Sequence, residues 1–376
     1  MQDIEPLGIY LHIPFCESIC NYCNFNRGLL DSSVKQRYVD ALEKEILAAA
    51  TEETVDSVYF GGGTPSLLTP REIERLIFAC KDAFRLKKFS EITLETNPET
   101  VSIDLLEKWF RVGVNRISFG VQSFLDEELS RLGRLHSSAK ARQSIQEALS
   151  VGFDVSVDLM FWLPMQTRDD CSQSIDALLD LQPHHASLYI LELYPNSPLR
   201  EEMSRASWSQ APDEDVANMY LNALSSTDAA GYEQYEISNI ALPEKRCRHN
   251  LKYWQDGEWM GFGCGAYSTR KGQRWKNILD TEQYIKTIFN GHSTIIDRHE
   301  LTREERVGDV IFTGLRLTEG LDLEKIAFKY GIDVMERYGE RLRPFLDSGL
   351  LVHSDGYLRL TRSGMLVSNE VMGTFV

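Results

Sequence analysis

Three cysteines lie close together in the stretch IYLHIPFCESICNYCNFNRG, directly after a short apolar run. Cys16, Cys20 and Cys23 belong to a chain of 376 residues with seven cysteines in all. Such a local cluster is typical of metal binding or catalysis and does not look like a disulfide framework. Three thiolates are one ligand short of the four that close a structural zinc site. The spacing therefore raises the question of what supplies the fourth ligand.

Two metal sites are compatible with these thiols. A zinc site would need His12 as its fourth ligand, but His12 lies within the apolar run, a poor position for closing a tight loop. An iron–sulfur cluster is the better interpretation, because thiolates are its usual ligands. Three cysteines leave one iron of a four-iron cluster without protein sulfur, and a small molecule with an amine and a carboxylate can chelate that iron. We therefore expect a [4Fe–4S] cluster whose open corner a substrate or cofactor fills.

The elements that must position this cluster alternate between strands and helices. Helical spacing of apolar residues predicts helices over 34–49, 69–84, 102–113, 125–150 and 168–181, with Thr69 as an N-cap and Pro70 at the first helical position. Strands are predicted over 8–14, 57–62, 91–97, 116–124, 154–164 and 185–193.

This alternation predicts an α/β fold with a parallel sheet and right-handed crossovers, either doubly wound or a partial (β/α)6 barrel. In both folds the loops after the carboxyl ends of the strands form the active face. The cysteines follow the first strand and Gly61–Gly63 follow the second, so both land on that face.

The C-terminal part has a different pattern. Short helices precede a small hairpin that turns at Asp355–Gly356, an arrangement similar to a winged helix. We predict three regions, 1–240, 241–300 and 301–376. A winged-helix redox sensor that binds DNA is an alternative, but the net charge of −16 speaks against a nucleic-acid partner.

Composition indicates an ordinary globular protein, since 43% of the residues are hydrophobic. The sequence shows no apolar run long enough for a membrane span and no secretory signal. We therefore expect a cytoplasmic protein that meets membranes only through its partners.

The motifs resemble a known family. C-x₃-C-x₂-C after the first strand of a βα protein is the signature of radical S-adenosylmethionine proteins, in which the methionine end of the cofactor chelates the open iron. YLHIPFC, FGGGTPSLL, VNRISFGVQSF, LGRLH, VDLMFWLPMQT, QYEISN and RHNLKYW follow in the order found in the coproporphyrinogen-dehydrogenase branch. The resemblance covers nearly the whole chain and is strongest to the HemW-type heme chaperones of that branch.

The resemblance implies roles for particular residues. Glu95, Gln122 and Asp158 also stand out without it, because each interrupts an apolar run near the end of a strand. The cluster ligands would be Cys16, Cys20 and Cys23. The residues expected around S-adenosylmethionine are Tyr10, Tyr22, Asn24, Gly61, Gly62, Gly63, Thr64, Glu95, Gln122, Arg134 and Asp158.

The implied function is that of a heme chaperone, which binds heme and passes it to acceptor proteins with a reductant such as flavodoxin or ferredoxin. True coproporphyrinogen dehydrogenases, the alternative, usually carry a further cysteine where this chain has Phe25, so oxidative decarboxylation of propionates is in doubt. Other radical chemistry on a tetrapyrrole also stays open. In the H-N-x-x-Y-W motif the resemblance implies His249 as a heme ligand, with Cys247 as a weaker choice; the alternative is that His249 is a packed core residue.

Three positions depart from the family pattern. Trp162 and Met165 stand where relatives usually have glycine, and we expect their bulk to narrow the space near the cofactor. Tyr267 stands where relatives often have histidine, which implies different handling of heme.

Overall fold

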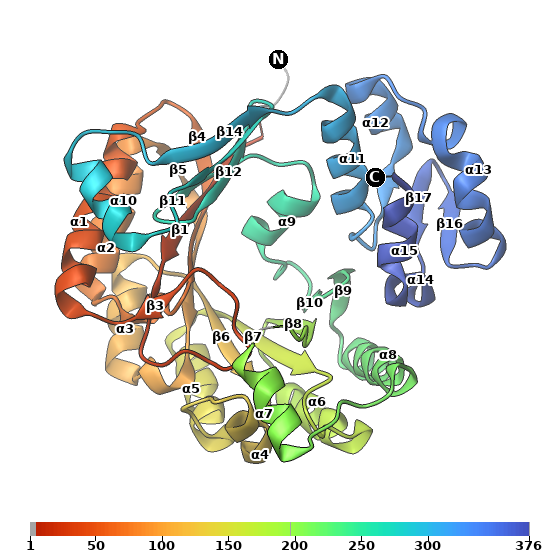
Figure 1. The fold of residues 1–376 in the computed structure, drawn as a ribbon, viewed down its shortest axis with the longest axis horizontal. Coiled ribbons are helices and arrows are strands. Elements are labelled where there is room, and N and C mark those ends of the chain that lie inside the picture. Colours follow the sequence, from red (N-terminus) through yellow and green to blue (C-terminus); the bar gives the residue numbers. More distant parts are fainter. Residues whose placement is uncertain (1–4, 196, 376) are drawn as a thin grey trace.

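The computed structural model describes residues 5–195 and 197–375 and centres on one sheet of twelve strands. Six neighbouring strands run parallel in chain order and carry the nearly continuous apolar runs expected of buried strands (Figure 1). They are β1 (Leu7–Ile13), β4 (Thr54–Gly62), β5 (Arg85–Thr96), β6 (Arg116–Gln122), β7 (Asp154–Phe161) and β8 (His185–Ile190).

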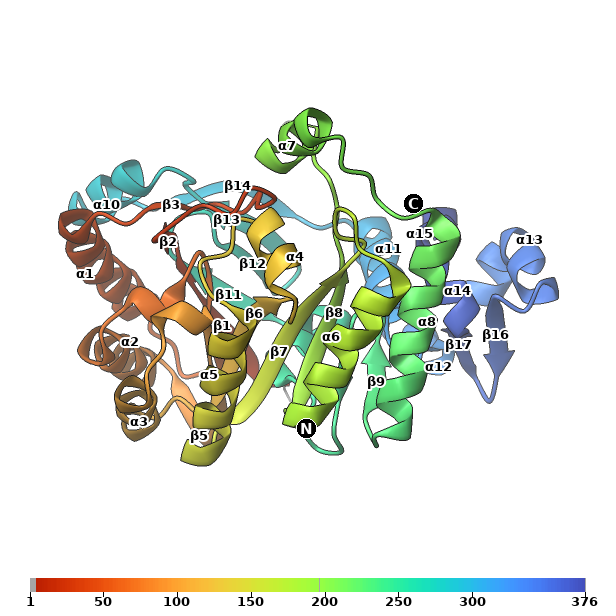
Figure 2. The ribbon, with the colours of Figure 1, turned by 90° about the horizontal axis from the view of Figure 1, so that it is seen from below.

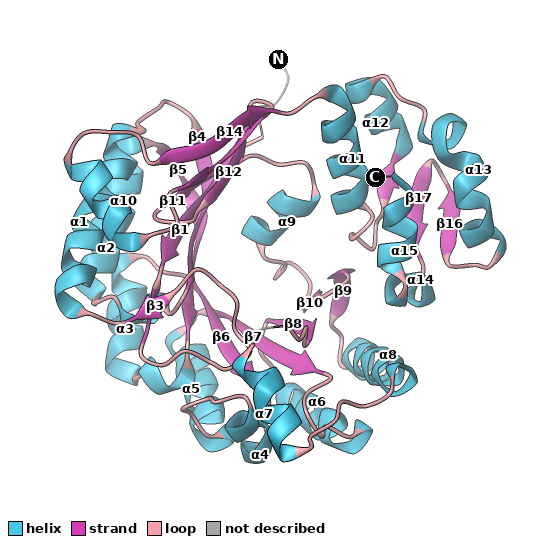
Figure 3. Ribbon diagram, in the orientation of Figure 1, coloured by secondary structure: helices cyan, strands magenta, loops and turns pink. Residues whose placement is uncertain are grey.

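Helices cover the outer face of this curved sheet (Figures 1 and 3). Because the helices lie on one side and the sheet curls around the other, the fold is a partial (β/α)6 barrel, and the doubly wound alternative is wrong. The barrel is open, since the two outermost strands of the described sheet each pair on one side. The covering helices are α1 (Ser32–Ala48), α2 (Pro70–Ala83), α3 (Ile103–Val112), α4 (Asp126–Arg131), α5 (Ser138–Val151) and α6 (Arg168–Leu181).

Local sequence signals place these helices well. Thr69 caps α2 as predicted, and Glu72 completes a capping box in which each side chain accepts a bond from the other residue's backbone. Helix α6 has the predicted bounds, with Thr167 as its cap. The predicted helix over 125–150 is two helices, α4 and α5.

Beyond β8 the chain returns to the sheet. Helix α7 (Pro198–Ala206) lies near the carboxyl ends of the strands (Figure 2), where the Asn21 backbone oxygen accepts a bond from the Leu199 amide at 3.0 Å. Helix α8 (Asp213–Ala229) packs against α6. Strands β9 (Glu233–Glu236) and β10 (Asn239–Ala241) then form one edge of the sheet, before the short helix α9 (Arg248–Trp254).

The region predicted as a connection, 241–300, carries four further strands of the same sheet. β11 pairs in parallel with β1, and the next three strands extend the sheet to its other edge. The bounds are β11 (Trp259–Phe262), β12 (Tyr267–Arg270), β13 (Gln273–Asn277) and β14 (Ile295–Glu300), with α10 (Thr281–Phe289) between the last two.

The C-terminal part has its own hydrophobic cluster and the predicted hairpin, with Asp355 and Gly356 at φ 53° and 78°. Arg316 connects it to the barrel through Glu236, at 3.0 Å. The three region boundaries stay predictions. The elements here are α11 (Arg303–Gly314), β15 (Leu321–Asp322), α12 (Leu323–Tyr330), α13 (Val334–Asp347), β16 (Leu351–Ser354), β17 (Tyr357–Leu360), α14 (Arg362–Leu366) and α15 (Ser368–Met372).

In the described part of the chain, every helix is too short or too polar to cross a membrane. The cytoplasmic location stays a prediction.

Candidate functional site

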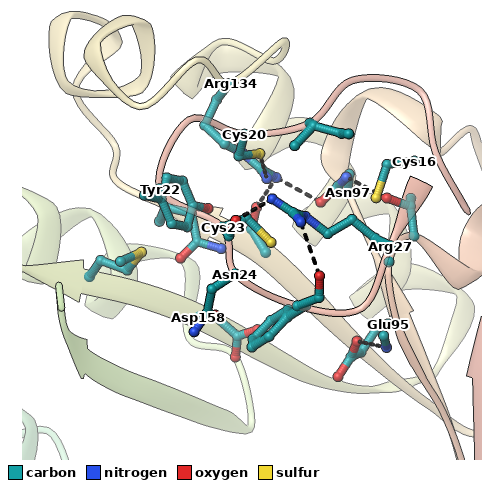
Figure 4. A pocket seen from close by; sticks show the side chains of 18 of the residues that line it. Cys16, Cys20, Tyr22, Cys23, Asn24, Arg27, Glu95, Asn97, Arg134 and Asp158 are labelled. Atoms are coloured by element: carbon teal, nitrogen blue, oxygen red, sulfur yellow. Dashed lines mark hydrogen bonds between the residues drawn. The ribbon is translucent and has the colours of Figure 1, made fainter. Parts of the chain in front are cut away.

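A cavity of about 340 Å³ opens at the carboxyl ends of the parallel strands (Figure 4). Its walls come from the cysteine loop, the loop after β4, and strands β5 to β8. It brings together twelve of the predicted residues: Cys16, Cys20, Tyr22, Cys23, Asn24, Gly62, Gly63, Thr64, Glu95, Gln122, Arg134 and Asp158.

Three predicted residues lie outside this lining. Gly61 is buried directly beneath it, where an added Cβ would meet the Tyr10 ring at 2.9 Å. Tyr10 places its hydroxyl 3.1 Å from Nδ1 of His12, and its ring packs toward His249. His249 is buried and does not line the cavity.

The three cysteines share the cavity, but their thiols do not converge on one point. Among residues 5–195 and 197–375, no three His, Cys, Asp or Glu side chains form a ready-made metal site. Arg27 extends between Cys16 and Cys20 and donates to the backbone oxygens of Phe25, at 3.0 Å, and of Cys23 (Figure 4). The sulfur donors fit an iron–sulfur cluster in type, and binding one would require the loop to rearrange around it.

The zinc alternative loses its fourth ligand in this arrangement. The ring of His12 is buried, with Nε2 2.7 Å from the backbone oxygen of Asn26 and Nδ1 engaged by Tyr10. His12 does not line the cavity.

A glycine turn holds the cysteine strand in place. The amide of Gly63 donates to the Ile13 oxygen at 2.8 Å, and the amide of Thr64 donates to the Phe15 oxygen at 2.7 Å. Gly62 adopts φ +117°, which favours glycine. The turn after β4 therefore fixes the start of the segment that carries Cys16 (β2, Phe15–Cys16).

Two half-buried carboxyl groups line the cavity. Glu95 accepts from the Tyr59 hydroxyl at 2.8 Å and from the Gly62 amide at 3.1 Å, and burial raises its pKa to about 7. Burial likewise raises the pKa of Asp158 to about 6, while Ser118 donates to it at 3.4 Å. A ligand that carries positive charge and hydroxyl groups would compensate for this burial.

Sequence reasoning missed a bridge across the cavity. Arg134 donates to Sγ of Cys20 at 3.2 Å and to Oδ1 of Asn97 at 2.7 Å, and Asn97 donates to Thr64 at 3.2 Å. Asn97 follows β5 directly, and that position at a strand end was the available signal. Arg27, Ser118 and Tyr189 also line the cavity and were not predicted.

The unusual bulky residues do not narrow the cavity, so that prediction is wrong. Trp162 and Met165 both have positive φ, 62° and 61°, which explains why glycine suits these positions. Their side chains turn toward the segment before α8: Trp162 donates through Nε1 to the Ala211 oxygen at 2.7 Å, and Met165 accepts from the Ser209 amide at 3.4 Å. Tyr267 is 54% exposed on β12, outside the cavity.

His249 is a packed residue in this structure. Its Nδ1 lies 3.0 Å from the Ser57 hydroxyl, its Nε2 lies 2.9 Å from the Tyr253 hydroxyl, and its ring stacks on Tyr59. The imidazole is 1% exposed, and burial lowers its pKa to about 3. Iron ligation by His249 would require α9 to move and the hydrogen bond at the ligating nitrogen to break, while the other nitrogen could keep its partner. Cys247, the weaker choice, is also buried, beside Glu91.

This burial predicts a pH effect. The unfolded chain binds a proton at position 249 below about pH 6.5, while the folded protein does so only near pH 3. The stability from a neutral His249 is therefore complete above pH 6.5 and falls as the pH drops toward 3. When the pH is lowered from 7.5 to 5.5, the wild type should lose free energy of unfolding. His249→Gln should lose about 1 kcal/mol less, because it has no imidazole to protonate. Urea unfolding at both pH values measures the difference.

His353→Gln is the matched control, because His353 is exposed on β16. Its pH dependence should follow that of the wild type. Equal slopes for wild type and His249→Gln would show that the buried ring takes up its proton over the same pH range as in the unfolded chain.

Comparison with known proteins agrees with this geometry. The sequence profile of the radical SAM superfamily matches residues 10–178, and that of the HemN C-terminal domain matches residues 301–367. The heme chaperone HemW of Bacillus subtilis is 36% identical over 372 residues, covering 98% of each chain. The heme chaperone HemW of Escherichia coli is 31% identical and covers 100% of both chains.

A solved structure shows the same fold. Coproporphyrinogen III oxidase (HemN) from Escherichia coli superposes with a TM-score of 0.87 over 99% of this chain and 90% of that one, at 22% identity. The full-length identity to the HemW proteins is the more specific finding, and the chain belongs to the HemW heme-chaperone family of radical S-adenosylmethionine proteins.

Proposed function

We propose that this protein is a heme chaperone that also holds a [4Fe–4S] cluster and S-adenosylmethionine. The observation that carries the cofactor part is one shared cavity, which is lined by the three cysteines, the glycine turn, Glu95 and Asp158. Full-length similarity to proteins named heme chaperone HemW supports the heme part.

Cys16, Cys20 and Cys23 would hold the cluster, and its open iron would take the amino and carboxylate groups of S-adenosylmethionine. The cluster, when reduced, supplies one electron to that cofactor. The chain's own residues position the ligand. Glu95 and Asp158 offer anionic acceptors to its positive charge and hydroxyl groups, and the Gly62–Thr64 turn lets it approach the backbone.

Phe25 favours the chaperone over a coproporphyrinogen dehydrogenase. It lines the cavity and is 64% exposed, at the position where the dehydrogenases carry their extra cysteine. We therefore propose that the protein takes up intact heme and passes it to acceptor proteins, with a flavodoxin or ferredoxin as reductant.

One experiment tests this function. The cluster is reconstituted without oxygen, and reductant, S-adenosylmethionine and either heme or coproporphyrinogen are added before mass spectrometry. We expect stoichiometric uptake of heme with the tetrapyrrole intact. Repeated turnover that yields 5′-deoxyadenosine and a decarboxylated or cleaved tetrapyrrole would replace the chaperone with a radical enzyme.

Glu95→Gln tests the cofactor pocket. Removing the carboxylate leaves the positive charge of the ligand without its partner, a loss of about 1.5–3 kcal/mol. The affinity for S-adenosylmethionine should fall tenfold or more, while the visible absorption of the reconstituted cluster stays unchanged. Equilibrium dialysis of the anaerobic protein measures the affinity.

Glu107→Gln is its control, because Glu107 is exposed on α3, pairs with Arg111 and does not line the cavity. Equal affinities in the two variants would remove Glu95 from the proposed pocket.

A further inference from the structure

Helix α9 lies between the barrel and the C-terminal part of the chain (Figure 1). It contacts β4 of the barrel and α11 of the C-terminal part. His249 is buried on this helix, so a ligand reaches its imidazole only when α9 moves. The contacts that hold α9 therefore control access to His249.

The barrel holds the N-terminal end of α9. The backbone amides of Arg248 and His249 both donate to the carboxylate of Glu91, each at 3.1 Å, and Glu91 is 7% exposed. Farther along the helix, Lys252 pairs with Asp56 at 2.7 Å. Hydrogen bonds shielded from water in this way are costly to break, so this end of the helix is the harder one to release.

The C-terminal part holds the other end of α9. Asp256, two residues beyond the helix, accepts hydrogen bonds from Nζ of Lys329 and from the hydroxyl of Tyr330, at the end of α12. The side chains of Asp256 and Lys329 are 30% and 44% exposed. Water can replace these contacts at a modest cost in free energy.

A second contact lies close to the first. The guanidinium of Arg316 lies 4.4 Å from the ring centre of Trp254, the last residue of α9. Arg316 also donates to Glu236 of the barrel at 3.0 Å. This cation–π contact joins the C-terminal part to the final residue of the H-N-x-x-Y-W motif.

The interface around these two contacts is loosely packed. A cavity of about 380 Å³ lies between the end of α9 and the C-terminal part. Its lining includes Trp254 and Asp256 on one side and Leu317, Ile326 and Tyr330 on the other. Partly exposed contacts beside a cavity open at a lower cost than the buried contacts at the other end of the helix.

We propose that the C-terminal part regulates the heme site, with Asp256 as a latch that ties the end of α9 to Lys329 and Tyr330. While the latch is closed, His249 stays buried in the barrel. When it opens, α9 swings outward from its C-terminal end and stays attached at Glu91. The proposal rests on the proposed function, in which His249 takes the heme iron, and adds the control of that step.

Amide hydrogen exchange of the full metal-free chain tests the latch without any ligand. Asp256→Asn removes the charge and keeps a residue type that tolerates the left-handed backbone at this position, where φ is 57°. The amides of α9 should exchange about fivefold faster in Asp256→Asn than in the wild type. Lys329→Gln should change the exchange in the same direction.

Asp228→Asn is the matched control. Asp228 on α8 pairs with Arg362 on α14, so this pair also joins the barrel to the C-terminal part, and the substitution removes the same charge. Neither residue belongs to α9 or lines the cavity at its end. Exchange of the α9 amides in Asp228→Asn should equal that of the wild type. Equal exchange in Asp256→Asn and the wild type would overturn the latch.

Hemin titration of the same proteins tests the regulatory role. Asp256→Asn should bind hemin about fivefold more tightly than the wild type, because a larger fraction of the protein is open before the ligand arrives. Asp228→Asn should bind hemin as the wild type does. Unchanged affinity in Asp256→Asn would overturn the regulatory role, and an equal gain in both variants would show a general effect of charge and overturn it too. Wild type and variants that all bind no hemin would overturn the proposed function itself.

Discussion

Cys20→Ala is expected to abolish the iron–sulfur cluster. Two remaining thiolates cannot hold a four-iron cluster, whose irons need sulfur donors from the protein. Iron content after anaerobic reconstitution should fall from about four per chain to less than one, and the broad visible absorption should disappear. Binding of S-adenosylmethionine should fall with it, because the open iron supplies part of that binding.

The matched control is Cys171→Ala. Cys171 is 2% exposed in α6 and packs in the core, so its removal should lower stability by about 1 kcal/mol and leave the iron content unchanged. Retention of full iron by Cys20→Ala would contradict the ligand assignment. A wild-type protein that holds zinc in place of iron would contradict it as well.

Most of the fold could be predicted from the sequence, because the signals for its helices and turns are local. The cap at Thr69, the bounds of α6 and the turn at Asp355–Gly356 all depend on neighbouring residues, and all three predictions are confirmed. The open barrel could not be separated from a doubly wound sheet, because that choice depends on how far the sheet curls and which side the helices take.

The strands over 259–300 were missed for a related reason. Strands β11 and β12 have four residues each, and glycine and aromatic residues obscure their alternation. What stabilises them is pairing between distant segments, as where Gly8 on β1 lies beside Trp259 on β11. No pattern in a short window contains that information.

The site also has a part that local motifs predict and a part that depends on contacts between distant segments. The cysteines and the glycine turn are compact motifs, so sequence was enough to bring them to one face. The bridge from Arg134 through Asn97 to Thr64 depends on the register of separate strands and loops. The state of His249 depends on Ser57 and Tyr59, nearly two hundred residues earlier in the chain, and a buried histidine and a ligand histidine look alike in sequence.

The glycine turn offers the sharpest test of how the fold positions the cysteines. A Cβ built at Gly63 would lie 2.7 Å from the Phe15 oxygen and 3.0 Å from the Ile13 oxygen. Both neighbours are backbone, so no rotation of a side chain can relieve the contact. Gly63→Ala must therefore push the turn away from the segment that carries Cys16 and break two backbone hydrogen bonds.

We expect Gly63→Ala to lower the free energy of unfolding by about 2–4 kcal/mol, from overpacking together with the lost hydrogen bonds. Urea unfolding of the metal-free protein measures this loss. The affinity of the reconstituted protein for S-adenosylmethionine should also fall about tenfold or more, a loss of at least about 1.4 kcal/mol.

Gly28→Ala gives the comparison within the same region. Gly28 lies on β3 (Gly28–Leu29), which pairs with the Phe15–Cys16 strand, yet an added Cβ there meets no atom within 4 Å. The free energy of unfolding of Gly28→Ala should stay within about 0.5 kcal/mol of the wild-type value. Equal stability and equal cofactor affinity in the two variants would show that close backbone packing at Gly63 does not set the position of Cys16.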